Sequence, residues 1–499
     1  MSATPLVEEL VPAPDPLEAC AGLADLGFLV LLDSAADPEH LGRHSFLAAG
    51  PFTAVRSKGA LTQRLVDGRW TRVGEDPLEH TRLLLAPCAA EPVAGIPPFQ
   101  GGAAGYLGYD WGAMLERIPR PRHDDLAIPD VLLGLYDWVI AWDHPARRAW
   151  LVSTGMPEQG AARTERAARR LAFVKQRLAD GRTGGRADGK GETRNGKRGS
   201  LEHHVSRFPF PVSRDACAPS YPVPDVPGVR SNFTRPGYLE AVARVIEYVG
   251  AGDIFQANLS QRLHAPLVGA PFELYRRLRR RNPAPFAAFL DFGDVVVASS
   301  SPERFLRVHD GRQVETRPIK GTRPRGAGPE HDAALALALA ESEKDRAENV
   351  MIVDLLRNDL SRVCRPGSVR VPELFALEHY ATVHHLVSTV VGELAAEHGP
   401  VELVRAAFPG GSITGAPKVR AMQIIAELEP TQRGVYCGAI GYLSVTGALD
   451  TSIVIRTYLV LERDVYFQVG GGIVADSDPE QEYRETLDKA RSLIAALTP

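Results

Sequence analysis

Two neighbouring apolar runs near the C-terminus decide the fold: V-Y-C-G-A-I-G-Y-L-S-V at residues 435–445 and I-V-I-R-T-Y-L-V-L at residues 453–461. Both are short and rich in β-branched and aromatic residues, which is typical of strands. A segment with helical periodicity follows them and runs to Leu497. Strands and helices therefore come in blocks rather than in strict alternation, and this predicts an α+β fold with antiparallel sheets.

Helical patterns flank these strands. Residues 234–249 have apolar residues at helical spacing, with Thr234 as the expected N-cap. An Ala/Leu-rich helical stretch covers residues 331–363. The last helix should begin with Asp478 as N-cap and Pro479 at its first position. Its expected core stripe is Tyr483, Leu487, Ala490, Ile494 and Leu497.

The N-terminal part of the chain reads differently. F-L-V-L-L-D-S near Leu31, the run from Gly101 and the run from Asp130 predict strands, and residues 163–178 predict a closing helix. Residues 181–199 are rich in glycine and charge and lack aromatic residues, which predicts a flexible linker. We therefore expect a β-rich domain at residues 14–178, a linker at 179–230 and a catalytic domain at 231–497.

Composition excludes several classes of protein. The net charge of −4 gives no basic footprint for nucleic acid or an anionic membrane. No apolar run approaches the roughly 18 residues of a membrane span, and the N-terminus lacks the pattern of a signal peptide. The chain has five cysteines and no C-x-x-C spacing. Because this argues against a disulfide framework or a zinc site, we expect a cytoplasmic protein.

Lys320 is a candidate nucleophile. It lies in R-P-I-K-G-T-R-P-R-G, residues 317–326, between a short apolar strand and a Gly-Thr turn. The nearby positive charges of Arg317, Arg323 and Arg325 and partial burial would both disfavour its ammonium form, so its amine would be partly free near neutral pH. The alternative is an ordinary solvated basic loop.

Two acidic pairs predict a magnesium site. Asp345 and Glu348 stand three residues apart on one expected helix, and Glu482 and Glu485 repeat this spacing on the last helix, with Lys489 one turn further on. Carboxylates from two helices that face one cavity repel each other unless a cation lies between them, and oxygen-only ligands suit Mg²⁺. The alternative is a solvated acidic helix surface.

Two glycine-rich turns could approach an anion through backbone N–H groups: F-P-G-G-S-I-T-G-A-P-K at residues 408–418 and Q-V-G-G-G-I-V-A-D-S-D at residues 468–478. The first is not a nucleotide-binding P-loop, because Ala416 stands where the lysine should follow Gly415. No G-x-G-x-x-G motif opens a βαβ unit, which argues against dinucleotide binding.

Polar residues also occur within apolar runs. Arg456 interrupts a strand, and such an arginine commonly holds a carboxylate from the protein or a ligand. His385 precedes L-V-S-T-V-V, and Tyr436 opens Y-C-G-A-I-G. Glu303 follows the strand V-V-V-A-S, where a desolvated carboxyl group could act as a general acid. A core histidine and a structural ion pair remain the alternatives for His385 and Arg456.

The ordered set of motifs in the C-terminal 265 residues or so resembles the chorismate-utilising enzymes. It includes G-D-I-F-Q-A-N-L-S-Q-R, S-P-E-R-F, P-I-K-G-T-R-P-R, A-E-N-V-M-I-V-D-L-L-R-N-D-L, H-L-V-S-T-V, G-G-S-I-T-G-A-P-K, Y-C-G-A-I-G-Y and A-D-S-D-P-E-Q-E-Y-R-E-T-L-D-K-A. The resemblance implies an anthranilate-synthase-like body of two stacked antiparallel β-sheets flanked by helices. A looser N-terminal match implies an amino-acid (tryptophan) pocket at Leu32, Asp33 and Ser34.

The resemblance also implies roles for the site residues. Glu348 and Glu485 would bind Mg²⁺ directly, with Asp345 and Glu482 as water-mediated or auxiliary ligands. Glu303 would protonate the departing C4 hydroxyl of chorismate. The expected substrate-binding residues are Gln256, Thr322, His385, Thr414, Tyr436, Arg456, Gly470, Gly471, Gly472 and Lys489.

Two positions indicate the branch of the family. Gln256 stands where isochorismate and salicylate synthases have a lysine that activates water, so addition of water is disfavoured. Lys320 stands where anthranilate synthases typically read P-I-A-G-T. The lysine implies the aminodeoxychorismate synthase branch, in which it attacks C2 and ammonia then resolves the adduct at C4; anthranilate synthase component I is the alternative.

The ammonia should come from a separate glutamine amidotransferase subunit. No cysteine lies in the G-x-C-x-G turn of a glutaminase, since Cys437 is flanked by Val435 and Ala439 at the positions that need glycine. There is also no sign of a fused pyridoxal-phosphate lyase. A catalytically silent regulatory subunit that binds an amino acid is an alternative of a different class, but both acidic pairs are intact.

Overall fold

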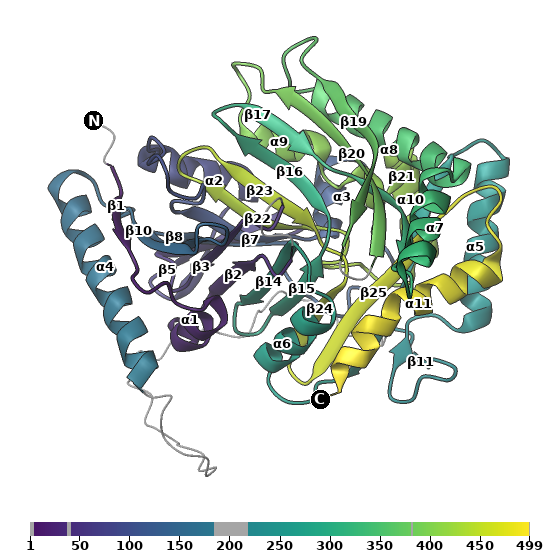
Figure 1. Cartoon of the computed structure of the whole chain (residues 1–499), viewed down its shortest axis with the longest axis horizontal. Helices are drawn as coiled ribbons and strands as arrows, with labels where there is room; N and C mark the ends of the chain where they lie inside the picture. Colours follow the sequence, from purple (N-terminus) through teal and green to yellow (C-terminus); the bar gives the residue numbers. More distant parts are fainter. Residues whose placement is uncertain (1–3, 37–40, 184–217, 381–382, 499) are drawn as a thin grey trace.

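The computed structural model describes residues 4–36, 41–183, 218–380 and 383–498. Within these residues the strands form two antiparallel sheets, of 13 and 12 strands. Helices lie along the outside of this body (Figure 1). The α+β prediction with two antiparallel sheets is therefore confirmed. Most of the expected linker, at residues 184–217, lies outside the described residues, and no helix in the described part is both long and apolar enough to span a membrane.

The strands of the first sheet are, in spatial order, β1 (Leu6–Glu9), β10 (Arg148–Ser153), β9 (Trp138–Asp143), β3 (His44–Ala48), β2 (Leu29–Asp33), β14 (Phe286–Asp291), β15 (Val296–Ser301), β24 (Thr457–Leu461), β25 (Asp464–Ile473), β13 (Gln256–Pro266), β12 (Arg230–Ser231) and β11 (Tyr221–Pro222), with β21 (Gly415–Ala416) beside β13.

The strands of the second sheet are β18 (Ile319–Pro324), β20 (Val383–Glu393), β17 (Gln313–Thr316), β16 (Arg304–His309), β23 (Leu449–Ile453), β22 (Ala439–Ser444), β7 (Gly102–Leu107), β8 (Val131–Tyr136), β4 (Thr53–Lys58), β5 (Leu61–Val66) and β6 (Arg69–Gly74), with β19 (Arg370–His379) beside β20.

The described helices are α1 (Pro16–Leu23), α2 (Pro77–Leu85), α3 (Gly112–Leu115), α4 (Gly160–Thr183), α5 (Arg235–Gly250), α6 (Pro271–Arg281), α7 (Pro329–Ala340), α8 (Glu343–Ser361), α9 (Pro400–Ala407), α10 (Lys418–Leu428) and α11 (Pro479–Leu497).

Strands from before and after the expected linker are joined in both sheets. In the first sheet β2 pairs with β14, so that Asp33 lies opposite Ala287. In the second sheet β7 pairs with β22, so that Leu107 lies opposite Ala439. In Figure 1 the purple and blue N-terminal strands accordingly continue into the green and yellow strands without a break in either sheet.

The main apolar core lies between the two sheets. It combines Val30 and Leu290 of the first sheet with Tyr106 and Ile440 of the second, and all four are buried. A second cluster fills the space between the first sheet and helices α1, α6 and α11, and a third lies between the second sheet and helices α8 and α9. The apolar faces of the sheets and helices thus bury one another, which fixes the positions of the helix ends.

The helix starts agree with the sequence signals. Thr234 accepts a hydrogen bond from the N–H of Gly237, and Asp478 accepts one from the N–H of Gln481 at 2.9 Å. Of the predicted stripe of α11, Tyr483, Ala490 and Leu497 are buried, and the other two residues pack against the core. The helical stretch at residues 331–363 contains both α7 and α8, which are separated because Ser342 caps the second helix.

Candidate active site

The candidate residues from distant parts of the chain converge beside Lys320. Lys320 belongs to β18, Glu303 lies between β15 and β16, Glu348 belongs to α8, and Glu485 and Lys489 belong to α11. All four of these ionisable groups interact electrostatically with the Lys320 amine. The fold therefore brings the expected nucleophile, the expected acid and one carboxylate from each acidic pair to one place.

Burial lowers the pKa of Lys320, and the charge of Lys489 adds to this effect, although Glu348, Glu303 and Glu485 oppose it. The neighbouring arginines were expected to supply the like charge, but each is occupied by a carboxylate. Arg323 pairs with Asp345 at 2.9 Å, Arg325 with Asp332 at 2.6 Å, and Arg317 with Glu373 and Glu378. The free-amine form of Lys320 is therefore favoured by burial and by the positive charge of Lys489.

Glu303 lies in an environment that favours its protonated form. Its residue is 4% exposed, and burial raises the pKa of its carboxyl group to about 7, against a hydrogen bond from Ser412 and the charge of Lys320. A carboxyl group with such a pKa holds a proton in a large fraction of molecules near neutral pH and can donate it. Glu303 is thus desolvated in the structure, as its predicted role as a general acid requires.

The two acidic pairs lie on helices whose first turns are fixed by caps. The hydroxyl of Ser342 accepts a hydrogen bond from the N–H of Asp345, and Asp478 caps α11. This leaves both pairs in or next to the first turns of their helices. Glu348 and Glu482 each interact electrostatically with Glu485, which places the carboxylates of both helices near one another.

These carboxylates respond to their surroundings in different ways. Burial raises the pKa of Glu348 and also that of Glu482, which accepts a hydrogen bond from Ser477 at 2.7 Å. Burial also acts to raise the pKa of Glu485, but the charges of Lys489, Lys344 and Lys320 outweigh it, so the net pKa is lowered. The Lys489 amine lies 2.6 Å from Glu485.

Oxygen donors from two helices fit the ligand preference of Mg²⁺, and burial, together with the charge of Glu485, raises the pKa values of Glu348 and Glu482. Asp345 is already held by Arg323, which suits an auxiliary rather than a direct position. Within the described residues, no three or more histidine, cysteine, aspartate or glutamate side chains stand in a preformed ligand cluster. One carboxylate of the two pairs, that of Glu485, is instead paired with Lys489.

The three glycines of β25 lie beyond the paired part of β24, and a Cβ atom on Gly471 would lie 3.1 Å from a carboxylate oxygen of Glu482. Gly470, Gly471 and Gly472 pair with β13 on one side, and the carbonyl group of Gly470 accepts a hydrogen bond from Lys489 at 2.8 Å. A Cβ atom on Gly472 would lie 1.7 Å from the Gln256 amide nitrogen. Glycine at this position therefore allows the Gln256 side chain to cross the strand.

Gln256 and Thr414 are buried, but in different hydrogen-bonding states. The Gln256 side-chain oxygen has no hydrogen-bond partner among the described residues, so it is an available acceptor inside the site. The hydroxyl group of Thr414 donates to the carbonyl oxygen of Gly410 at 3.0 Å and thereby holds the glycine-rich turn. Both residues lie where β21 pairs with β13.

His385 and Tyr436 add two buried groups to the site. Burial, together with the nearby charge of Arg456, lowers the pKa of His385 to about 4, so its ring is neutral near pH 7. Its Nδ1 lies 2.9 Å from the hydroxyl of Thr322. Burial raises the pKa of Tyr436 well above its ordinary value, so its hydroxyl stays protonated and can donate a hydrogen bond.

Arg456 is a half-buried cation whose charge no described carboxylate neutralises. Its residue lies between β23 and β24, and burial lowers its pKa. No carboxylate of the described residues forms an ion pair with it; its Nη1 donates to the side-chain oxygen of Asn282 at 3.0 Å. An unneutralised guanidinium beside His385 is well suited to bind an anionic group of a ligand.

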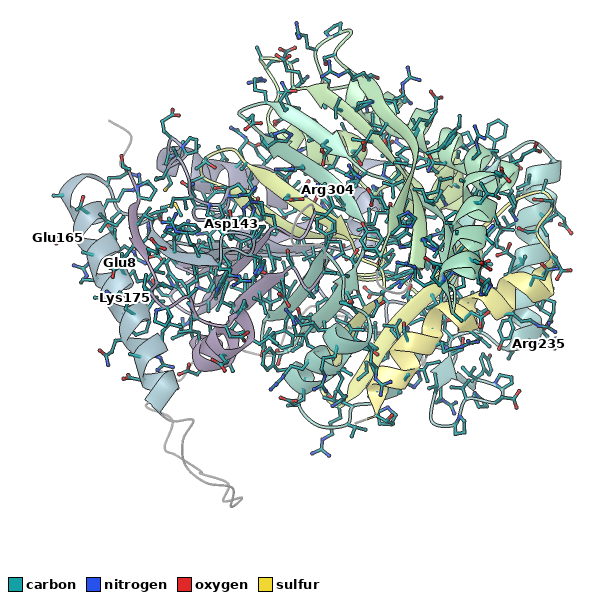
Figure 2. The ribbon with its side chains drawn as sticks, viewed as in Figure 1. Glu8, Asp143, Glu165, Lys175, Arg235 and Arg304 are labelled. Carbon is teal, nitrogen blue, oxygen red and sulfur yellow. The ribbon has the colours of Figure 1, made fainter. Side chains whose placement is uncertain are left out.

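Leu32, Asp33 and Ser34 line a separate cavity of about 110 Å³ near the centre of the molecule. Arg304, labelled in the middle of Figure 2, also lines it. The space exceeds that of one water molecule several times over, so it can hold a small ligand. The Asp33 carboxylate, however, is already bound by Tyr275 at 2.7 Å and by Arg279.

Two residues that interact with the expected catalytic groups were not singled out from the sequence. Lys344 interacts electrostatically with Glu348, Glu482 and Glu485, and Ser412 hydrogen-bonds Glu303. Their signals were their positions: Lys344 directly precedes the first acidic pair, and Ser412 lies inside the first glycine-rich turn. Neither residue type is distinctive without its spatial neighbours.

Comparison with known proteins shows extensive similarity. A family model described as chorismate binding enzyme matches residues 31–495. "Aminodeoxychorismate synthase component 1" of Klebsiella aerogenes is 40% identical over 476 residues, with 95% of each chain covered. "Anthranilate synthase component 1" of Thermus thermophilus is 43% identical over 453 residues, covering 89% of each chain.

A solved structure extends this similarity to the fold. The crystal structure of anthranilate synthase component I from Streptococcus pneumoniae superposes with a TM-score of 0.72 at 31% identity, covering 91% of this chain and 92% of that one. The resemblance that was carried by the motifs is thus confirmed along almost the whole length. The chain belongs to the family of chorismate binding enzymes.

Proposed function

We propose that this chain is the ammonia-using component of an aminodeoxychorismate synthase, which converts chorismate and ammonia to 4-amino-4-deoxychorismate, a precursor of 4-aminobenzoate and folate. The observation that carries the proposal is the position of Lys320, whose amine interacts with both Glu303 and Glu348. An amine whose ammonium form is disfavoured, beside a protonated acid, suits nucleophilic displacement of a hydroxyl group. The component 1 relatives from three enteric bacteria support the same activity.

Lys320 acts as the nucleophile. Its neutral amine attacks C2 of chorismate while the C4–O bond breaks, and the C4 hydroxyl leaves as water with a proton from Glu303. The lysine amine loses one proton in forming the C–N bond, and this proton restores the Glu303 acid. Ammonia then attacks C4 and gives up one proton, and the Lys320 nitrogen takes up one proton as its bond to C2 breaks, so that the free amine is restored. The lowered pKa of Lys320 and the raised pKa of Glu303 favour the two protonation states that the first step needs.

The other polar groups bind and orient the substrate. Arg456, Tyr436, Lys489 and the backbone of Gly470–Gly472 would hold the two carboxylates of chorismate, because they supply cationic or hydrogen-bond-donating groups. His385, Thr322 and Thr414 line the ring region. Gln256 cannot act as a base, because its side chain is a neutral amide; its free oxygen accepts a hydrogen bond.

Glu348 and Glu485 would hold Mg²⁺, with Asp345 and Glu482 in auxiliary positions. When bound, the ion neutralises the acidic pairs and holds a carboxylate of the substrate. Titration calorimetry tests this without turnover: Mg²⁺ should bind the wild-type protein, and Glu348→Gln should weaken binding at least about tenfold. A variant that binds Mg²⁺ as tightly as wild type would contradict the assignment of Glu348.

We further propose that a separate glutamine amidotransferase subunit supplies the ammonia, in the cytoplasm. The four described cysteines are all buried, and burial raises the pKa of Cys437 to about 12. None of these four thiols is suited to hydrolyse glutamine. Addition of a glutamine amidotransferase of the component 2 type should allow glutamine to replace ammonium salt as the nitrogen donor.

The deciding experiment is identification of the product by mass spectrometry after incubation of the chain with chorismate, Mg²⁺ and ammonium salt. Aminodeoxychorismate without release of pyruvate is the expected result. Fluorescent anthranilate with release of pyruvate, in the absence of any added lyase, would instead identify an anthranilate synthase. The 43% identity to the Thermus thermophilus protein is the observation that keeps this alternative open to test.

The cavity at Leu32, Asp33 and Ser34 would bind an amino acid such as tryptophan. Its lining combines the ring of Phe46 with the charged side chains of Arg307 and Asp450, which can recognise an aromatic body and a zwitterionic head group. Calorimetry with tryptophan, with glycine as the control ligand, tests this. Equal heats for the two amino acids, or no binding of tryptophan, would exclude it.

A further inference from the structure

Arg456 has a backbone conformation that its neighbours must hold in place. Its φ angle is +51°, in the left-handed region that a long side chain seldom adopts. The N–H of Ser300 donates to the Arg456 carbonyl oxygen at 3.1 Å, which fixes the main chain between β23 and β24. The direction of the guanidinium is thus set by a constrained backbone and by whatever its nitrogen atoms contact.

Asn282 makes that contact from the end of α6, which packs beside β15 (Figure 1). Its residue is 6% exposed, and its side-chain oxygen accepts the 3.0 Å hydrogen bond from Arg456. Its side-chain nitrogen donates to the carbonyl oxygen of Ser300 at 3.4 Å. Because a guanidinium can only donate, the amide has one orientation that satisfies both partners.

The chemistry of this partner differs from that of the carboxylates that hold Arg304 and Arg433, two arginines of the same body. Arg304 is paired with Asp450 and Glu315, and Arg433 is paired with Glu429 at 2.7 Å. Those carboxylates neutralise the arginines that they orient. Asn282 orients Arg456 with a neutral amide, so the positive charge remains available to an anion from outside the protein.

We infer that Asn282 is a positioning residue that aims Arg456 at a carboxylate of the substrate and, being uncharged, leaves the charge of the arginine for that carboxylate. The inference rests on the proposed function only in taking chorismate as the anion. It concerns binding, not the identity of the product.

Asn282→Asp separates this role from a merely structural one. The substitution keeps the size and the acceptor oxygen but adds a carboxylate that would pair with Arg456. We expect the dissociation constant for chorismate, measured by calorimetry with Mg²⁺ and without ammonium, to rise about tenfold to a hundredfold, the usual worth of a hydrogen bond between charged groups. The melting temperature should stay at or above the wild-type value. If Asn282 were only a structural tether, the dissociation constant would stay at the wild-type value, because aspartate preserves the contact with Arg456.

Asn282→Ala is the second variant. It removes the acceptor without adding charge, so we expect a rise of about threefold to tenfold in the dissociation constant. Asn232→Asp is the matched control: Asn232 is equally buried and accepts a hydrogen bond from the N–H of Arg262, away from Arg456. It should change chorismate affinity less than about twofold.

Wild-type affinity in Asn282→Asp would overturn the inference. If that variant does not fold, Asn282→Ala decides, and unchanged affinity there would overturn it equally. Because no ammonium is present, the result does not depend on which product the enzyme makes. Formation of anthranilate by the wild-type protein would refute the proposed function while leaving this inference standing.

Discussion

The candidate active site and the cavity at Leu32, Asp33 and Ser34 both contain charged groups, but the charges are neutralised to different degrees. In the cavity wall the Asp33 carboxylate is held by Arg279 and Tyr275. In the active site, Arg456 has no carboxylate partner among the described residues, and the pKa values of Lys320 and Glu303 are displaced toward the neutral forms. Paired charges hold elements together, whereas incompletely paired charges are available for chemistry.

The sharpest way to break this comparison is to remove one lysine from the active site and one whose charge is paired elsewhere in the molecule. Lys320→Ala should lower kcat about a thousandfold or more, because the nucleophile is lost, with little change in the melting temperature. Steady-state kinetics with chorismate and ammonium, together with thermal unfolding, measure both. Unchanged turnover would refute the role of Lys320.

Lys418 is the matched control, since its amine is bound by Asp359 at 2.6 Å and by the carbonyl group of Ala407. Lys418→Ala leaves a buried carboxylate unpaired and should cost about 3–5 kcal/mol of unfolding free energy. Urea unfolding measures this cost. If both lysine variants lost stability and activity in equal proportion, the distinction between the two environments would fail.

Glu303→Gln should lower kcat about a hundredfold or more, because an amide cannot donate the proton to the leaving hydroxyl. In the wild-type enzyme the rate of this step should fall as pH rises through about 7, where Glu303 loses its proton. Only the enzyme with protonated Glu303 can supply the proton. The fall of kcat that Glu303 causes as pH rises should therefore be absent from the pH profile of the variant. A variant that kept this fall would assign it to another group.

The same substitution should change stability in a pH-dependent way. The pKa of Glu303 is raised in the folded state from 4.5 to about 7. The contribution of Glu303 to the free energy of unfolding is therefore fully present below about pH 4.5 and is lost as pH rises through 7. Glu303→Gln should therefore be more stable than wild type by about 3 kcal/mol at pH 8, and the difference should vanish below pH 4.5. Denaturant unfolding at the two pH values measures this. Equal differences at both would contradict the burial of the charge.

On the paired side, Asp33→Asn should cost about 1.5–3 kcal/mol of stability, since Arg279 loses its charged partner, while kcat with ammonium remains within about twofold. Urea unfolding and steady-state kinetics are the measurements. A large loss of kcat without loss of stability would show that Asp33 serves catalysis.

The smallest effect is expected for Tyr275→Phe, which removes one hydrogen bond to Asp33 and keeps the ring. It should cost about 1 kcal/mol, less than Asp33→Asn, because Arg279 still pairs with the carboxylate. Urea unfolding measures the loss. A larger loss than for Asp33→Asn would mean that the Tyr275 hydroxyl, rather than Arg279, is the stronger partner of the Asp33 carboxylate.

Local features of the fold could be predicted because they depend on neighbours in sequence. The caps at Thr234 and Asp478 and the alternation of strands and helices fall in this class. The pairings of β2 with β14 and of β7 with β22 could not be read from either strand, because residues more than 200 positions apart set them.

The same limit applies to the candidate site. The spacing of the acidic pairs and the motif around Lys320 indicated which residues matter, but not what surrounds each one. The sequence suggested that Arg317, Arg323 and Arg325 would repel the lysine, whereas their carboxylate partners come from α7, α8 and β19. Lys489, 169 positions away along the chain, supplies the like charge. Electrostatic environment is a property of the assembled fold.

The strand pairs β2–β14 and β7–β22 have a consequence for dividing the molecule. A cut in the segment between residues 183 and 218 would separate two fragments, each with two long unpaired strand edges, one per sheet. Such edges invite aggregation when alone but recognise each other by backbone register when together. We therefore expect that two co-expressed pieces would restore activity only by completing each other's sheets.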